Sequence, residues 1–231
     1  MSVATVAAAN QLDSGTFTPA LFAGTDPNTQ MVWLNKAVWS GEPRRSMIGC
    51  YGPATIDTAF QFGINTSTNF SVWRWGGIPL INVANATLPT NQWIHFVYRW
   101  TGTNSQLMVN NVVVDTTTEV PQSSNITQTW VNGFPTGGAS ETVGDYLVSD
   151  YRLYNRLLSF DEITTIYNLR GKDHINFGLV GHWVFNEGNP NAAVSVIRDI
   201  SPNGNDMTPV TTAMEYRDNV LQVRRDYITN Y

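Results

Sequence analysis

Apolar side chains recur at every second position through most of this chain. The segment Trp93–Trp100 reads WIHFVYRW, with one apolar face and with His95 and Arg99 on the other face. A repeat of two is the side-chain period of a β-strand, and we expect this strand to be half-buried with a partly polar outer face. Comparable short runs of apolar and aromatic residues lie at 30–39, 60–64, 70–75, 146–154 and 179–185. Because Gly, Pro, Asn and Ser interrupt these runs, the pattern predicts an all-β sandwich of two antiparallel sheets.

A β-hairpin is predicted where Asn110–Asn111 separates two short runs. Asparagine tolerates the positive φ that a two-residue hairpin turn requires at its central positions. We therefore expect the flanking strands, Gln106–Val109 and Val112–Asp115, to pair with each other.

One segment departs from the β pattern and predicts a single short helix near 160–170. Ser159 and Glu162 have the spacing of a capping box, in which the serine hydroxyl accepts from the glutamate amide and the carboxylate accepts from the serine amide. Apolar residues then recur with helical spacing from Ile163, and Gly171 can end the helix. On this basis we assign Ser159 and Glu162 a structural role rather than a catalytic one.

The composition excludes several classes of function. The 231 residues carry a net charge of -5, and only 13% are charged, whereas a surface that binds nucleic acid is basic and clustered. The single cysteine, Cys50, rules out an internal disulfide framework, and the three histidines lie far apart in the sequence, which leaves no Cys/His zinc cluster. No apolar run approaches the roughly 20 residues of a membrane helix, so we expect no membrane insertion.

Three segments resemble the laminin-G-like, or concanavalin-A-like, jelly-roll family, of the kind found in phage virion proteins. Residues 92–114 are similar to its Trp-x-His strand and following hairpin, with Asn111 where the family usually has glycine. Residues 144–167 match its closing strand and helix through the stretch RLYNRLLSFDEI. Residues 178–207 look like its opening strand, here WVFNEG, followed by the turn DISPNGND. The resemblance implies a concanavalin-A-like jelly roll.

The order of these segments is unusual, because the opening-type segment follows the helix. Either a second domain begins near residue 178 and is cut short, or the sandwich is circularly permuted. A truncated domain would leave Trp183 and Phe185 unburied, at a cost of about 1.5–3 kcal/mol for each large apolar side chain. We therefore expect one permuted domain over 1–231, with an N-terminal arm (1–20), a main sandwich and helix (21–171) and a C-terminal segment that completes the sandwich (172–231).

Trp73 and Trp75 are candidates for sugar binding, because they share one face of a predicted strand and two coplanar indoles can stack on a pyranose ring. The alternative is that the pair belongs to the core. Jelly-roll glycosidases use two opposed carboxylates. No Glu-x-Asp-x-Glu strand is present, and Glu187 and Asp199 are the nearest acidic pair, so no catalytic residue is predicted.

Four side chains around Gly204 are candidate calcium ligands, because they offer hard oxygen atoms: Asp199, Asn203, Asn205 and Asp206. The segment is not an EF-hand, since the twelfth position counted from Asp199 is Val210 rather than glutamate. The alternative is a tight turn, which the sequence Ser-Pro-Asn-Gly favours by itself. No other cofactor is predicted.

These features favour a non-enzymatic structural or adhesion protein on the outside of a virus particle, such as a phage capsid decoration, fibre or tail-surface protein. Residues 2–9 are weakly apolar and lack a basic start, so we expect synthesis in the host cytoplasm without a signal peptide. The expected partners are other virion proteins or further copies of the chain. A lectin-like module that binds host surface glycans is the alternative, and a glycoside hydrolase is a more distant one.

Overall fold

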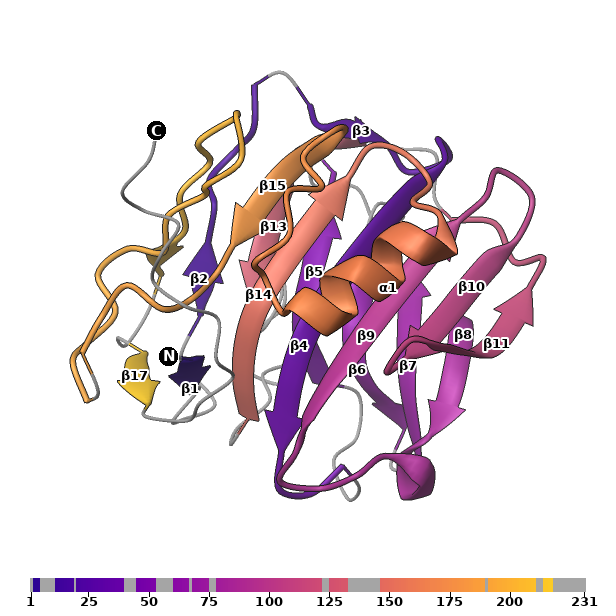
Figure 1. The fold of residues 1–231 in the computed structure, drawn as a ribbon, viewed down its shortest axis with the longest axis horizontal. Helices are drawn as coiled ribbons and strands as arrows, with labels where there is room; N and C mark the ends of the chain where they lie inside the picture. The colour runs from indigo at the N-terminus through magenta and orange to yellow at the C-terminus, as the bar shows by residue number, and fades with distance from the viewer. Residues whose placement is uncertain are drawn as a thin grey trace.

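Two β-sheets pack face to face, and one α-helix lies on the outer side of one of them (Figure 1). The predicted all-β sandwich with a short helix is therefore confirmed. The structure is a computed structural model. It describes residues 2–4, 11–18, 20–39, 45–52, 60–66, 68–74, 78–121, 125–132, 146–189, 191–210 and 214–217.

Sheet A forms the layer that carries the helix, and within the described residues it has eight antiparallel strands. Seven of them follow the order β11 (Val112–Thr117), β10 (Ser105–Val109), β9 (Trp93–Trp100), β4 (Asn28–Lys36), β14 (Tyr146–Tyr154), β1 (Ser2–Ala4) and β17 (Glu215–Arg217). The eighth, β15 (Leu179–Trp183), also pairs with β14.

Sheet B forms the second layer, and its described part has seven strands. Their order is β16 (Thr208–Pro209), β2 (Leu12–Asp13), β13 (Gln128–Val131), β5 (Arg45–Tyr51), β6 (Phe60–Thr66), β7 (Asn69–Arg74) and β8 (Ile78–Ala84). A separate two-stranded ladder joins β3 (Phe22–Ala23) to β12 (Asn125–Ile126), and a short 3-10 helix covers Asn85–Thr87.

The main core lies between the two sheets and is built from alternate residues of each strand. Phe70 of β7 stacks on Phe96 of β9 with 4.0 Å between ring centroids, and Phe60 of β6 lies 5.7 Å from Tyr98. All four rings are at most 1% exposed. Because side chains alternate along a strand, the residues between these rings point away from the core.

The predicted hairpin is confirmed, and its turn also contacts the helix. Val109 and Val112 pair directly, and Asn110 and Asn111 both have positive φ, at 48° and 67°. Asn111 Nδ2 lies 2.9 Å from Thr164 Oγ1. Asparagine at this position therefore joins the turn to the helix, which a glycine could not do.

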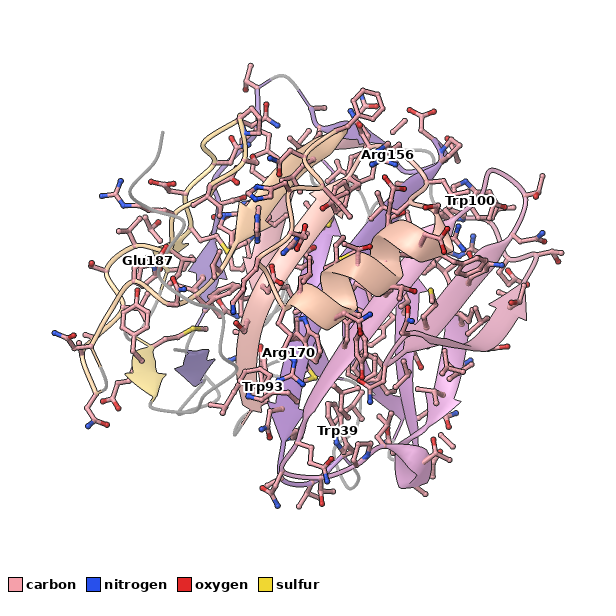
Figure 2. The ribbon with its side chains drawn as sticks, in the orientation of Figure 1. Trp39, Trp93, Trp100, Arg156, Arg170 and Glu187 are labelled. Atoms are coloured by element: carbon pink, nitrogen blue, oxygen red, sulfur yellow. The ribbon has the colours of Figure 1, made fainter. Side chains whose placement is uncertain are left out.

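The predicted helix is confirmed as α1 (Phe160–Leu169), with the complete capping box of Ser159 and Glu162. Arg170 ends it in the left-handed conformation with φ 47°. Figure 2 shows Arg156 and Arg170 near opposite ends of α1, and Arg156 Nη2 lies 2.6 Å from Glu162 Oε1. Among the described residues, no helix is long and apolar enough to cross a membrane.

The outer face of β9 differs from the expected half-buried surface, because α1 covers it. Met31 and Val97 on sheet A form an apolar cluster with Ile163 and Ile166 of α1. His95 is only 1% exposed and Arg99 only 5% exposed. Alternation of apolar and polar residues shows which side chains share a face of a strand. It does not show which other element packs on that face.

The C-terminal segment takes places in both sheets. Strand β15 lies beside β14, with Trp183 opposite Tyr151, while β16 pairs with β2 in sheet B and β17 pairs with β1 in sheet A. Trp183 is fully buried and belongs to the main core. Residues 1–20, expected to form an arm, contribute β1 and β2 to these ladders because their backbone groups pair with neighbouring strands.

Candidate functional site

Four residues form a line across the outer face of sheet B, at right angles to its strands. Trp130 of β13 pairs with Gly49 of β5, Gly49 pairs with Gln61 of β6, and Gln61 pairs with Trp73 of β7. We call these four residues the Trp130–Trp73 row. The neighbouring side chains of Val131, Phe62 and Val72 belong to the main core, so alternation places the row on the opposite face.

Two polar atoms of the row have no hydrogen-bond partner among the residues that the structure describes. They are the Nε1 donor of Trp130 and the Oε1 acceptor of Gln61, and the two side chains belong to residues that are 6% and 1% exposed. A buried polar group without a partner costs about 1–3 kcal/mol. Other buried side-chain atoms of the described residues also lack a partner, among them Trp33 Nε1 and both ring nitrogens of His95. The pair in the row is distinguished by its place on one face of sheet B beside aromatic side chains.

Tyr51 fills the gap that Gly49 leaves between these two atoms. A Cβ atom at Gly49 would lie 2.8 Å from the Tyr51 hydroxyl oxygen and 2.7 Å from the Phe60 carbonyl oxygen. Only glycine therefore lets the tyrosine lie along its own strand at this point. The Tyr51 hydroxyl is 3.4 Å from Ser46 Oγ.

A hydrogen-bonded polar pair flanks the row on the β13 side. Gln128 Nε2 donates to Asp13 Oδ1 at 2.8 Å, and Asp13 is the cross-strand neighbour of Trp130. Asp13 and Gln128 are both partly exposed. The row thus continues onto β2, where the Asp13 carboxylate is partly exposed.

Of the two tryptophans predicted to bind sugar, Trp73 lies in the row. It is turned away from the main core but is only 2% exposed, while Trp75 lies outside the described residues. Sequence reasoning missed Trp130 and Gln61. For Gln61 the sequence held a signal, because a polar residue alternates with phenylalanine at 60–62. For Trp130 it held none, because Gln128–Val131 is too short to show which face of the strand the tryptophan occupies.

The four predicted calcium ligands form a hydrogen-bonded turn instead of an open donor set. The Asp199 carboxylate accepts from the backbone amides of His182, Ser201 and Asn205 and from the Ser201 hydroxyl, at 2.8–2.9 Å. A carboxylate that accepts four hydrogen bonds has no lone pair directed at an ion. The other polar contacts also stabilise the turn: Asp206 accepts from the Asp199 amide, Asn203 donates to the Val180 carbonyl, and the Asn205 carbonyl accepts from Trp183.

The described residues include no group of three or more His, Cys, Asp or Glu side chains able to hold a metal ion. Glu187 belongs to the acidic pair that came nearest to a catalytic pair in the sequence, and it lies on the C-terminal segment (Figure 2). Its carboxylate accepts from the Arg198 amide at 2.7 Å, and burial raises its pKa. The geometry therefore assigns Glu187 to the packing of this segment.

A second polar cluster lies on the outer face of sheet A. Arg152 is fully enclosed, with Nε 2.7 Å from Asp150 Oδ1 and Nη1 2.8 Å from Asp173 Oδ1, and His182 Nε2 lies 2.7 Å from Asp150 Oδ1. Burial alone would raise the pKa of Asp150, but Arg152 and His182 lower it overall. Each charge has a partner from a different element, so we assign the cluster to holding together β14, β15 and the linker between α1 and β15 (residues 170–178).

A sequence model described as the concanavalin A-like lectin/glucanases superfamily matches residues 8–164. This chain belongs to that superfamily. The match covers more than half of the chain and agrees with the two antiparallel sheets described above. The superfamily includes lectins as well as glucanases, so membership by itself leaves open whether this member binds or cleaves. No curated protein matches the sequence.

Solved structures share the fold at low sequence identity. A candidate carbohydrate-binding protein from Bacteroides ovatus has a TM-score of 0.63 and 14% identity, over 94% of this chain and 60% of the other. The heptameric SAP-like pentraxin of Limulus polyphemus has a TM-score of 0.55 and 12% identity, over 91% and 94%. A Trypanosoma rangeli sialidase in complex with 2,3-difluorosialic acid has a TM-score of 0.50 and 13% identity, over 64% and 24%. This superfamily member therefore spans only part of the length of two of these proteins.

Proposed function

We propose that this protein is a carbohydrate-binding module without catalytic activity, and that it binds sugar on the outer face of sheet B. One observation carries the proposal: the unpaired Trp130 Nε1 donor and the unpaired Gln61 Oε1 acceptor lie on the same face, two strands apart. A sugar hydroxyl accepts and donates hydrogen bonds, so neighbouring hydroxyls on one molecule can satisfy both atoms.

The surrounding side chains suit the same ligand class. Trp130, Tyr51 and Trp73 supply aromatic surface beside the two polar atoms, and sugar-binding sites combine apolar ring contacts with a few placed polar groups. The description of the Bacteroides ovatus neighbour as a candidate carbohydrate-binding protein agrees with this reading. Gln61 and Trp73 are 1% and 2% exposed, so the partly exposed Asp13 and Gln128 beside Trp130 are the accessible part of this face.

The test is a glycan array followed by calorimetric titration of the full chain. We expect at least one glycan to bind, and we expect Trp130→Phe and Gln61→Leu each to weaken it about 3–10-fold, the value of one neutral hydrogen bond. Gln61→Leu should not lower the free energy of unfolding, since it removes an acceptor without a partner at nearly constant volume. Trp130→Phe also removes part of a buried indole, so its free energy of unfolding is measured beside its affinity. The matched control is Trp100→Phe: Trp100 lies in sheet A and its Nε1 donates to the Thr25 carbonyl, so this variant should lose stability and keep its glycan affinity. Absence of binding to any glycan would refute the proposal.

The permuted order of the chain is part of the same proposal. The pairing of β15 with β14 and of β16 with β2 supports the view that 178–209 takes the place of the family's opening strand and turn. The expected setting on a virus particle, and its other virion proteins as partners, stays a prediction. In that setting a glycan-binding face would serve attachment to a host surface.

A further inference from the structure

Four buried polar atoms without a hydrogen-bond partner among the described residues lie on neighbouring side chains of the outer face of sheet A. They are Trp33 Nε1, Trp93 Nε1 and the two ring nitrogens of His95. Trp33 stacks on His95 with 4.8 Å between ring centroids, and Trp93 packs against Trp33. Tyr167, on the last turn of α1, lies 5.5 Å from the Trp33 ring and 5.8 Å from the His95 ring. We call these four residues the His95 cluster.

The position of α1 keeps water away from these polar atoms. A neutral imidazole offers one N–H donor and one acceptor, and each indole offers one donor, all of which water can satisfy. A buried polar group without a partner costs free energy, so the last turn of α1 packs less favourably here than over an apolar surface. His95 is only 1% exposed, but Trp93 and Tyr167 are only partly buried, so the cluster lies just below the surface.

The two ends of α1, marked by Arg156 and Arg170 in Figure 2, are held by different contacts. At the N-terminal end, the capping box of Ser159 and Glu162 and the ion pair of Glu162 with Arg156, at 2.6 Å, fix the helix to the preceding chain. At the other end, Tyr167 contacts sheet A through its ring, and Arg170 ends the helix in the left-handed conformation. The apolar contacts of α1 belong to clusters separate from the main core. The last turn can therefore move while the N-terminal end of the helix and the main core stay in place.

From these contacts we propose that the last turn of α1 is a lid over the His95 cluster, and that acid opens this lid while the two sheets stay folded. Burial lowers the pKa of His95 to about 3, whereas a histidine in water titrates near 6.5. Between these values the open form binds a proton that the closed form does not bind. The ratio of open to closed molecules therefore rises about tenfold for each unit by which the pH falls.

The charged groups around the cluster do not compensate for a proton on His95. They are Asp150 and Arg152 of β14 and Asp173 of the linker, while the titratable group from α1 is Tyr167. The two carboxylates favour the proton and the guanidinium opposes it, but none of them forms a hydrogen bond with the imidazole ring. Both carboxylates already pair with Arg152. A protonated His95 thus has two N–H donors without an acceptor until the lid opens.

The experiment measures amide hydrogen exchange of the full chain by mass spectrometry between pH 4 and pH 6, after correction for the intrinsic pH dependence of exchange. We expect peptides that cover 163–170 to be at least about tenfold less protected than peptides of β14. Their protection should fall about tenfold for each unit by which the pH falls. The lower limit of pH 4 preserves the N-terminal contacts of α1, because Arg156 lowers the pKa of Glu162 to about 2.

Three variants separate the lid from general loosening of the fold. His95→Phe should remove most of the pH dependence at 163–170, because phenylalanine keeps the ring contacts and binds no proton. Tyr167→Ala leaves His95 in place, so it should lower the protection of 163–170 at least about tenfold at pH 6 and keep the pH dependence. Asn168→Gln, at an exposed position of the same turn, is the matched control and should change neither quantity.

Two results would overturn the proposal. One is equal protection of 163–170 and β14 at every pH, which would mean that α1 opens only when the whole sandwich unfolds. The other is protection of 163–170 that has the same pH dependence in His95→Phe as in the unmodified chain, which would mean that another group drives the opening.

Discussion

Trp183 lies directly opposite Tyr151 in the β14–β15 ladder, and the two rings stack with centroids 5.5 Å apart and an angle of 21° between their planes. The two residues are far apart in the sequence, yet both are fully buried in the main core. The C-terminal segment thus shares one core with the strands that precede it in the sequence.

Trp183→Ala should destabilise the whole sandwich. Removal of a fully buried tryptophan costs about 3–5 kcal/mol, because apolar burial is lost and a cavity remains. The measurement is the free energy of unfolding from urea denaturation followed by circular dichroism. Phe177→Ala is the control, since Phe177 is 82% exposed and its ring contacts the Arg156 guanidinium, so the loss should stay below about 1 kcal/mol. Equal effects of the two substitutions would contradict the shared core.

Asp173→Asn should break the buried ion pair that anchors the linker to β14. Arg152 Nη1 and Nη2 donate to the two Asp173 oxygens at 2.8 and 3.0 Å. Arg152 keeps its ion pair with Asp150, so the substitution should cost about 1.5–3 kcal/mol, the value of a hydrogen bond to a charged group. Glu119→Gln, on the exposed surface, provides the matched change of one acid to its amide. Thermal denaturation that gave the two variants the same midpoint would show that the ion pair contributes nothing.

Stability should fall as the pH drops from about 6.5 towards about 3, in part because of His95. Burial lowers the pKa of His95 to about 3, whereas an unfolded histidine titrates near 6.5. Between these values the unfolded chain binds a proton that the folded chain does not, so His95 contributes a slope of about 1.4 kcal/mol per pH unit. His182 has a lowered pKa as well, and acts in the same direction.

The histidine contribution can be isolated with His95→Phe, which keeps a ring in contact with both Trp33 and Tyr167. Urea denaturation at a series of pH values should show a smaller slope for this variant between pH 4 and pH 6. Phe177→Ala, which changes an exposed residue without a titratable group, should leave the slope unchanged. An unchanged slope in His95→Phe would mean that His95 is not buried in the neutral form.

Asn111→Ala should destabilise the protein more than Asn111→Gly. Both changes remove the two hydrogen bonds between the Asn111 amide and Thr164 Oγ1, each worth about 0.5–1.5 kcal/mol. Alanine must also adopt the φ of 67° seen at this position, which glycine adopts without a steric penalty. The measurement is the free energy of unfolding of the two variants, and a glycine variant less stable than the alanine variant would contradict this account of the turn.

Several elements could be predicted because their causes are local. The capping box of Ser159 and Glu162 depends on residues three positions apart, and the hairpin turn at Asn110–Asn111 depends on the φ preference of two asparagines. The class of the fold followed from alternation along single strands such as Trp93–Trp100. Each of these signals is complete within about ten residues of sequence.

The candidate site could not be predicted, because it is built from residues that meet only across strands. The row lies on four strands, with one residue on each: Trp130, Gly49, Gln61 and Trp73. The sequence of a single strand does not determine which strand it pairs with or in which register. Likewise, His95 was expected on a partly polar surface and is instead covered by α1. The sequence determined which segments are strands, turns and helix, since those depend on local sterics and periodicity. The tertiary structure decided which faces are covered and which side chains align, since those depend on long-range pairing and packing.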